Sequence, residues 1–309
     1  MSITYSIVVP VYDEVESLPS LYQRVRKVMA GTRETWELII VDDGSSDGST
    51  DLIRDLARKD RHVRPVIFAR NFGHQIAITA GWDYARGDAV VIIDADLQDP
   101  PEAIPQLAKK WKEGYEVVYA VRAVRVGESW FKKLTASVFY RLIYRITDVT
   151  IPVDSGDFRL MDRKVVDVLK KMRERHRFPR GMSAWVGFRQ IGVSYNRSPR
   201  YAGVTKYPIR KMLRLALNAI TSFSYFPLQV ATYFGFFSAG LAILAIPLVV
   251  YLRMAGIPQF TGQATTLIAV LFLGGIQLIS LGILGEYIGR LYDEAKGRPL
   301  YVVREGPDQ

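Results

Sequence analysis

The chain has 309 residues, of which 49% are hydrophobic, and its formal net charge at pH 7 is +10. It contains no cysteine, which excludes a disulfide-linked scaffold and a cysteine-ligated metal site. The positive charge gathers in residues 170–214, where thirteen Lys or Arg accompany a single acid, Glu174. This cluster favours an anionic lipid surface over nucleic acid as the partner, because the sequence lacks zinc-finger spacing and RNA-binding motifs and two membrane-length segments follow.

The first part of the chain alternates apolar runs with polar loops and amphipathic segments. Buried parallel strands are expected at four runs rich in Val and Ile: residues 5–10, 36–41, 63–69 and 90–93. Helices are expected between them, at residues 18–29, in the segment ending at Arg58 and in the segment ending at Ala85. We expect Ser49 or Thr50 to cap the second helix. This succession is typical of an open α/β sheet that binds ligands at the edge where its parallel strands end.

The middle of the chain continues with a fifth expected strand at residues 117–121, leading to Arg122, and a helix at residues 130–146. Residues 154–159, Asp-Ser-Gly-Asp-Phe-Arg, are predicted to form an acidic turn. Neither a Gly-x-Gly-x-x-Gly fingerprint nor a P-loop occurs in the sequence. A nucleotide would therefore be held by acidic loops and a metal ion rather than by a glycine-rich phosphate cradle.

The acidic stretch after the fourth strand carries the clearest chemical signal. Asp94 and Asp96 are two residues apart and precede the pair Pro100 and Pro101. If extended geometry continues to this point, both carboxylates leave on one face and converge on a hard cation, with Gln98 in reach. The alternative is a polar strand end made of turn-forming residues. The first interpretation predicts a metal ion that binds a diphosphate.

Two apolar stretches near the C-terminus, residues 226–252 and 265–288, are each long enough to span a bilayer as a helix. The short connection between them predicts an antiparallel hairpin. Basic residues lie beyond both outer ends, whereas the connection holds only Arg253, so the positive-inside rule predicts that both ends are cytoplasmic. Residues 208–223 have the amphipathic pattern of a helix that lies in the membrane interface.

Three further features concern the membrane part. The N-terminus carries only the short apolar run 7–11, so no cleaved signal is expected. Glu286 lies one turn before Arg290, which predicts an ion pair at the membrane surface rather than an acid that acts within the membrane. Small residues on the second stretch predict close helix packing, within the hairpin or in a homo-oligomer: Gly274, Gly275, Gly282 and Gly285.

Five motifs, in their order and spacing, resemble those of the polyprenyl-phosphate glycosyltransferases of glycosyltransferase family 2. They are Val9-Pro-Val-Tyr-Asp-Glu14, Val41-Asp-Asp-Gly-Ser-Ser-Asp-Gly-Ser49, Arg70-Asn-Phe-Gly-His-Gln75, Asp94-Ala-Asp-Leu-Gln-Asp-Pro100 and Gly203-Val-Thr-Lys-Tyr207. The resemblance covers nearly the whole chain. Asp13 departs from the pattern, since the family usually has Asn there. The absence of a Gln-x-x-Arg-Trp motif disfavours a processive polysaccharide synthase.

The resemblance implies an α/β fold of the GT-A (Rossmann-like) type, with a cytoplasmic catalytic domain in residues 1–205 that binds a nucleotide sugar. An interfacial amphipathic helix (206–226), a transmembrane hairpin (227–290, spans about 227–252 and 265–288) and a cytoplasmic tail (291–309) would follow. The protein would then be a multi-pass protein of the inner (plasma) membrane, with both termini in the cytoplasm.

The resemblance also implies a set of site residues. The donor nucleoside would be surrounded by Pro10, Tyr12, Asp13, Glu14, Asp43, Asn71 and Gln75. Mg²⁺ or Mn²⁺ on the donor diphosphate would be held by Asp94, Asp96 and Gln98. The acceptor phosphate would meet Arg122, Lys132, Arg200 and Lys206, chosen by motif or by charge. Asp96 and Asp157 are the expected catalytic residues.

The implied reaction is a metal-dependent, inverting transfer of a hexose from UDP-glucose to undecaprenyl or another polyprenyl phosphate. A mannose synthase that uses GDP-mannose is the alternative within the same class. A flippase for lipid-linked sugars and a non-catalytic membrane scaffold are alternatives of other classes. Asp157 would either accept the last proton of the acceptor or orient the sugar and a neighbouring Arg such as Arg159, because a phosphate nucleophile is already mostly ionised near neutral pH.

Overall fold

A computed structural model of the chain describes residues 3–122, 155–196, 226–255 and 263–307. The predicted helix at 130–146, most of the interfacial helix (206–226) and the predicted site residues Lys132, Arg200 and Lys206 lie outside the described residues. The described residues divide into two compact units, of which one contains the sheet together with residues 298–307 and the other contains the two long C-terminal helices.

The first unit is built on an eight-stranded sheet in the order β7-β5-β6-β4-β1-β2-β3-β8 among the described residues. Four neighbouring strands are parallel, as predicted: β1 (Tyr5–Val11), β2 (Trp36–Asp42), β3 (Val63–Phe68) and β4 (Ala89–Ile92). The other four complete the two sides: β5 (Val117–Arg122), β6 (Ser155–Asp162), β7 (Gln190–Tyr195) and β8 (Val303–Glu305). Strand β6 runs antiparallel between β4 and β5, and β8 runs antiparallel to β3.

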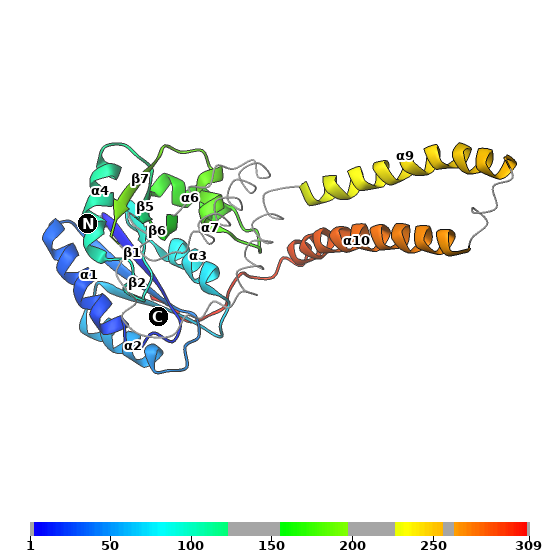
Figure 1. The fold of residues 1–309 in the computed structure, drawn as a ribbon. Coiled ribbons are helices and arrows are strands. Elements are labelled where there is room, and N and C mark those ends of the chain that lie inside the picture. The colour runs from blue at the N-terminus through cyan, green and yellow to red at the C-terminus, as the bar shows by residue number, and fades with distance from the viewer. Residues whose placement is uncertain (1–2, 123–154, 197–225, 256–262, 308–309) are drawn as a thin grey trace. The chain divides into compact units, whose positions relative to one another are not determined.

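Helices cover both faces of this sheet (Figure 1). Their bounds are α1 (Leu18–Thr32), α2 (Ser49–Lys59), α3 (His74–Tyr84), the 3-10 turn η1 (Pro101–Ala103), α4 (Ile104–Lys112), α6 (Arg163–Lys171) and α7 (Pro179–Trp185). Strand alternation divides the apolar side chains of β1 between the faces, because Ile7 and Val9 join the core under α1 and α4 whereas Val8 meets α3 at Gly81. The four parallel strands are therefore buried on both sides, which explains their unbroken runs of Val and Ile.

Two local expectations are wrong. Helix α2 begins at Ser49, but its N-cap is Gly48, and neither Ser49 nor Thr50 caps it; the Thr50 hydroxyl donates instead to Asp42 at the end of β2. The predicted acidic turn at residues 154–159 is, in its described part, the start of strand β6. Ser155 pairs with Val121 of β5, and this pairing overrides the turn preference of the Asp-Ser-Gly sequence; β4 pairs with the later part of β6, Arg159 to Asp162.

The second unit consists of two long helices that lie side by side, α9 (Phe226–Met254) and α10 (Gln263–Ala295). Each contains a segment long and apolar enough to cross a membrane, Pro227–Ala245 and Phe272–Ala295. Their apolar side chains are largely exposed, for example Phe236 at 74% and Leu278 at 72%. A soluble protein would bury such surface, so these helices suit contact with lipid.

The structure tests two predictions about this hairpin, an ion pair and close packing at glycines. The ion pair between Glu286 and Arg290 is confirmed, with 3.1 Å between Arg290 Nε and Glu286 Oε1. In contrast, a Cβ atom built on Gly274, Gly275, Gly282 or Gly285 would meet no atom within 4 Å. In the described part of the hairpin, therefore, these glycines do not mediate close packing between α9 and α10.

Candidate active site

The loops that follow β1, β2 and β3 are linked to one another at the edge of the sheet where the parallel strands end. Asp43, directly after β2, is 2% exposed, and its Oδ1 accepts hydrogen bonds from the backbone N–H of Phe72 at 2.6 Å and of Gly73 at 3.2 Å. Its immediate role is thus to hold the loop of residues 70–73 at the start of α3. Burial raises the pKa of Asp43 to about 6, although the two backbone hydrogen bonds oppose this shift.

Gly44 brings the second and third loops into contact. Its φ of +74° favours glycine, and a Cβ at this position would lie 2.6 Å from the carbonyl carbon of Arg70 and 2.7 Å from the nitrogen of Asn71. Any larger residue would push the two loops apart. The Asp-Asp-Gly sequence after β2 therefore serves to press these loops together as well as to supply carboxylates.

The first loop is tied to the second through Asp13. Its backbone has φ +52°, a conformation that Asn and Asp tolerate better than most residues, which fits the Asn usual in the family. The Asp13 carboxylate accepts a hydrogen bond of 2.8 Å from the backbone of Ser46, and its own backbone donates to the Ser45 hydroxyl at 3.0 Å. Asp13 therefore shapes the junction of the two loops.

The other predicted nucleoside residues differ in exposure. Tyr12 is exposed at 42% and Asn71 is also exposed, so both are open to a ligand. Pro10 is buried within β1, where packing explains it, and the Glu14 carboxylate accepts a hydrogen bond from Ser17 at the start of α1. The side-chain oxygen of Gln75 is buried without a hydrogen-bond partner, an arrangement that a ligand donor would relieve.

The acidic stretch after β4 keeps its predicted alternation only in part. Asp94, Asp96 and Gln98 are half-buried, whereas the residues between them are buried. The expected extended geometry does not reach Asp96, because β4 ends at Ile92 and residues 95–96 form a turn. After this turn Leu97 has φ +60°, and the Asp96 carboxylate accepts a hydrogen bond of 3.0 Å from the Gln98 backbone. Among the described residues, no group of three His, Asp or Glu side chains is already arranged around a metal position.

The carboxylate of Asp94 nevertheless has the properties of a metal ligand. Its Oδ1 is buried and accepts no hydrogen bond, although His74 Nε2 lies 3.6 Å away, and burial raises the pKa of the side chain to about 6 while the charge of His74 opposes this shift. A buried carboxylate oxygen in this state is stabilised by a cation. Asp94 therefore fits a divalent metal ion, with Asp96 two residues away as the second carboxylate.

Asp157 lies in β6, next to β4, and is 5% exposed. Arg180 of α7 binds it with two parallel hydrogen bonds, 2.8 Å from Nε to Oδ1 and 3.1 Å from Nη2 to Oδ2. The Nε2 atom of His74 is 3.4 Å from Asp157 Oδ2 and 3.6 Å from Asp94 Oδ1. Two acids and two bases from four separate segments thus meet at one point of the sheet edge.

The charges in this cluster support one another. Burial alone would raise the pKa of Asp157, but Arg180 and then His74 hold it well below its usual value. Burial alone would lower the pKa of His74, but its hydrogen bond to Asp157 and the charge of Asp94 raise it to about 9. At neutral pH Asp157 is therefore a carboxylate and His74 an imidazolium.

Sequence reasoning missed His74 and Arg180 as site residues. It named Arg159 as an Arg that Asp157 might orient, but the bidentate partner is Arg180, since Arg159 donates to Ser183 and to the Gly156 carbonyl. His74 belongs to the motif at residues 70–75 and is one of only three histidines, which was an available signal. Arg180 lies in no recognised motif, so only the fold reveals it. Of the predicted acceptor residues only Arg122 is described, as the last residue of β5.

Two family models match the chain. Residues 6–170 match the model described as glycosyl transferase family 2, and residues 226–291 match the model described as the GtrB C-terminal hairpin. The first match contains the parallel strands and their loops, and the second contains most of α9 and α10. The predicted architecture, a GT-A-type domain followed by a helical hairpin, is confirmed by these matches together with the observed sheet.

Two similar proteins match almost the whole chain. The uncharacterized glycosyltransferase YkcC of Bacillus subtilis (strain 168) is 53% identical over 303 residues, 98% of this chain and 94% of that protein. The SfII prophage-derived bactoprenol glucosyl transferase of Shigella flexneri is 44% identical over 301 residues, 97% of each chain. Among solved structures, glucosyl-3-phosphoglycerate synthase from Mycobacterium tuberculosis is 21% identical, with a TM-score of 0.47 over 71% of this chain and 77% of that one. The chain therefore belongs to glycosyltransferase family 2, as an enzyme whose catalytic domain is followed by a GtrB-type helical hairpin.

Proposed function

We propose that this enzyme transfers glucose from UDP-glucose to the phosphate of undecaprenyl phosphate or a similar polyprenyl phosphate. A phosphate oxygen of the acceptor attacks the anomeric carbon and forms the new C–O bond. The bond between that carbon and the UDP oxygen breaks, and its electron pair leaves with UDP. Attack from the side opposite UDP inverts the anomeric configuration and gives a polyprenyl-monophosphate sugar.

The observation that carries this proposal is the full-length similarity, at 44% identity, to a protein named a bactoprenol glucosyl transferase. Two properties of the structure support it. The loops at the ends of the parallel strands form the edge at which open α/β sheets bind ligands. The exposed apolar helices α9 and α10 suit an enzyme whose acceptor is a membrane lipid.

The donor diphosphate requires a positive partner, since the surrounding loops are acidic. We assign a divalent cation, Mg²⁺ or Mn²⁺, to Asp94 and Asp96, with Gln98 beside them. The unbonded and buried Oδ1 of Asp94 supports this assignment. Such an ion, when bound, neutralises the charge that develops on the departing UDP.

The nucleoside is assigned to the linked loops after β1, β2 and β3. Tyr12 and Asn71 are exposed enough for direct contact, and the unpartnered oxygen of Gln75 suits an N–H or O–H donor. Asp13 and Asp43 act on the nucleoside mainly by fixing the shape of these loops, because their carboxylates already accept backbone hydrogen bonds. Pro10 and Glu14 contribute through β1 and the start of α1.

Asp157 acts by positioning rather than as a general base. Its pKa is held below the ordinary carboxyl value, whereas the second pKa of a phosphate monoester is about 6. The acceptor phosphate is therefore the stronger base of the two, and it is mostly dianionic without assistance. Ionised Asp157 instead fixes Arg180 and His74, two cationic donors at the edge of the sheet.

The acceptor phosphate is assigned to four basic residues chosen by motif or by charge, namely Arg122, Lys132, Arg200 and Lys206. Arginine suits a phosphate because its planar donors match two oxygens at once. We further propose that the hairpin crosses the inner membrane twice, with the catalytic domain and both termini in the cytoplasm. The basic residues beyond both outer ends of the hairpin support this orientation.

The test is a reconstituted reaction with full-length protein in detergent or nanodiscs, radiolabelled UDP-glucose and undecaprenyl phosphate. A labelled lipid formed without other proteins is expected. GDP-mannose, tested in parallel, distinguishes the mannose synthase alternative. Binding of the donor without any labelled product from either nucleotide sugar would instead favour a scaffold and contradict the proposal.

A further inference from the structure

The C-terminal tail, defined here as residues 298–307, is an integral part of the sheet unit. Its strand β8 pairs antiparallel with the outer edge of β3, so that Val303 faces Phe68 and Glu305 faces Ile67. The tail follows α10 in the chain after only Lys296 and Gly297. A segment that comes directly after the membrane hairpin thus completes the catalytic sheet.

The tail holds the end of β3 by several contacts. The backbone N–H of Ala69 donates to the Val302 carbonyl at 2.9 Å, and the Arg304 side chain donates to the Ala69 carbonyl at 3.1 Å. The ring of Tyr301 stacks on Phe68, with 5.1 Å between centroids and 18° between planes. Ala69 directly precedes the loop of residues 70–73.

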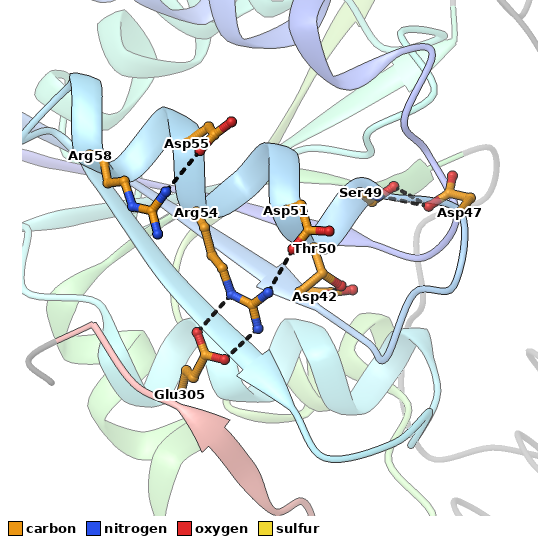
Figure 2. Close-up of polar contacts among 9 residues, drawn as sticks. All are labelled: Asp42, Asp47, Ser49, Thr50, Asp51, Arg54, Asp55, Arg58 and Glu305. Carbon is orange, nitrogen blue, oxygen red and sulfur yellow. Dashed lines mark hydrogen bonds and ion pairs between the residues drawn. The ribbon is translucent and has the colours of Figure 1, made fainter.

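A second anchor joins the tail to α2. Arg54 binds Glu305 with two hydrogen bonds, one of them 3.0 Å from Nε to Oε2, and also binds Asp51 at 2.7 Å (Figure 2). The same view shows Thr50 against Asp42, at the end of β2. The tail therefore contacts both elements, β3 and α2, that border the loops after β2 and β3.

These contacts continue into the loop of residues 70–73. Phe68, which stacks on Tyr301, also packs edge to face on Phe72, with 5.6 Å between centroids. The backbone of Phe72 in turn donates to Asp43. The loop is thus held on one side by Asp43 and on the other by the tail, through Phe68 and Ala69.

We propose that the C-terminal tail is a positioning element for the nucleotide part of the donor site. By fixing the end of β3, it keeps the loop of residues 70–73 in the geometry that receives the donor nucleoside. This inference rests on the proposed function, which assigns the nucleoside to that loop. The tail acts through the loop and touches neither the sugar nor the acceptor phosphate, so its loss weakens donor binding and leaves acceptor binding unchanged.

The test uses Tyr301→Ala in the full-length protein. Loss of an aromatic pair and of the hydrogen bond from Tyr301 to Asp83 should raise the donor KM about three- to tenfold. The dissociation constant of UDP, measured by calorimetry, should rise by a similar factor, while the KM for undecaprenyl phosphate stays unchanged. A chain that ends at residue 298 should show the same pattern more strongly.

The ion pair provides a second measurement with a matched control. Glu305→Arg alone should raise the dissociation constant of UDP about two- to fivefold, and adding Arg54→Glu should restore it in part, because the swapped pair reforms the contact between α2 and the tail while the contact of Arg54 with Asp51 is lost. Arg24→Ala is the control: Arg24 is as exposed as Arg54, at 33%, and makes a similar bidentate contact with Glu102 away from these loops. It should leave the dissociation constant of UDP unchanged.

The outcomes separate the inference from the proposed function. Donor KM and UDP affinity within twofold of wild type in both Tyr301→Ala and the shortened chain would overturn the inference. An equal rise of donor and acceptor KM would also overturn it, since that indicates general damage to the fold. If wild-type protein binds UDP but makes no labelled lipid, the proposed reaction fails, and UDP affinity of the variants still decides the role of the tail.

Discussion

Replacing Asp157 with Asn tests the positioning role most directly, because it keeps the shape of the side chain and removes its charge. Asn cannot accept both hydrogen bonds from Arg180, and it leaves Arg180 and His74 as cations without their shared acid. Removing one partner of a buried ion pair costs about 3–5 kcal/mol of stability. We use the lower value, about 3 kcal/mol, because the Arg180 side chain is 31% exposed and water can partly replace its lost partner. We expect a melting temperature lower by about 6–12 °C.

The turnover of this variant should fall about 100-fold, a loss that misplacing groups at a reacting centre by about 1 Å can cause. The fall should not shrink between pH 5.5 and pH 8. It grows with pH where His74, which loses the hydrogen bond that raises its pKa, releases its proton within this range. Asp157 has a depressed pKa in the folded protein, so it is ionised over this whole range. Its contribution to stability is therefore complete above the unfolded value of about 3.9 and is lost only as the pH falls through the folded pKa.

A general-base role predicts a different pH profile. Transfer of a proton from the acceptor, with a pKa of about 6, to a carboxyl below 3.8 is uphill by more than about 3 kcal/mol. If Asp157 nevertheless did this, the variant would use only dianionic acceptor, whose fraction rises about fourfold from pH 5.5 to pH 8. Turnover at saturating donor and acceptor should therefore be compared at these two pH values. A loss that shrinks fourfold would refute the positioning role.

Three other substitutions test separate parts of the molecule. Asp96→Ala should abolish metal-dependent turnover while leaving the melting temperature near that of wild type; full wild-type activity in excess EDTA would remove the metal from the reaction. Lys206→Ala should raise the KM for polyprenyl phosphate more than the KM for the donor, and an unchanged acceptor KM would remove Lys206 from the site. Gly81→Ala places a Cβ 2.0 Å from a methyl group of Val8 and should destabilise the sheet unit by about 1–3 kcal/mol, measurable as a lower melting temperature. An unchanged melting temperature would show that α3 and β1 adjust freely.

The parallel half of the sheet could be predicted because each of its strands is marked by its own run of apolar residues. A strand that is buried on both faces must be apolar at every position, so β1, β2 and β4 stand out as runs of Val and Ile. The residues after each run are polar because the strands end at an open edge. Asp43 and Asp94 could therefore be placed at that edge from the sequence alone.

The cluster around Asp157 could not be predicted in the same way, because its members are brought together by pairing between distant segments. The sequence Asp-Ser-Gly has turn preferences, and only the pairing of β6 with β4 places Asp157 beside the end of the parallel sheet. Arg180 arrives from α7, a helix too short for a clear periodic pattern. Asp157 could be identified from the sequence, but only the fold shows that Arg180 and His74 are the two cations that lower its pKa.

The tail is the clearest case in which sequence reasoning stops short. From sequence, residues 291–309 are a polar segment after a membrane span, and a three-residue strand is below the length that alternation can identify. What makes it a strand is the free edge of β3, which offers unpaired backbone groups beside Phe68 and Ala69. An edge strand has to be covered to prevent pairing with other chains, and here the cover comes from the segment just after α10. That segment also binds α2 through Glu305. The same few residues therefore cover the edge of β3 and hold the loop of residues 70–73 in place. A change in this tail should therefore affect nucleotide binding although no residue of the tail lies in the predicted site.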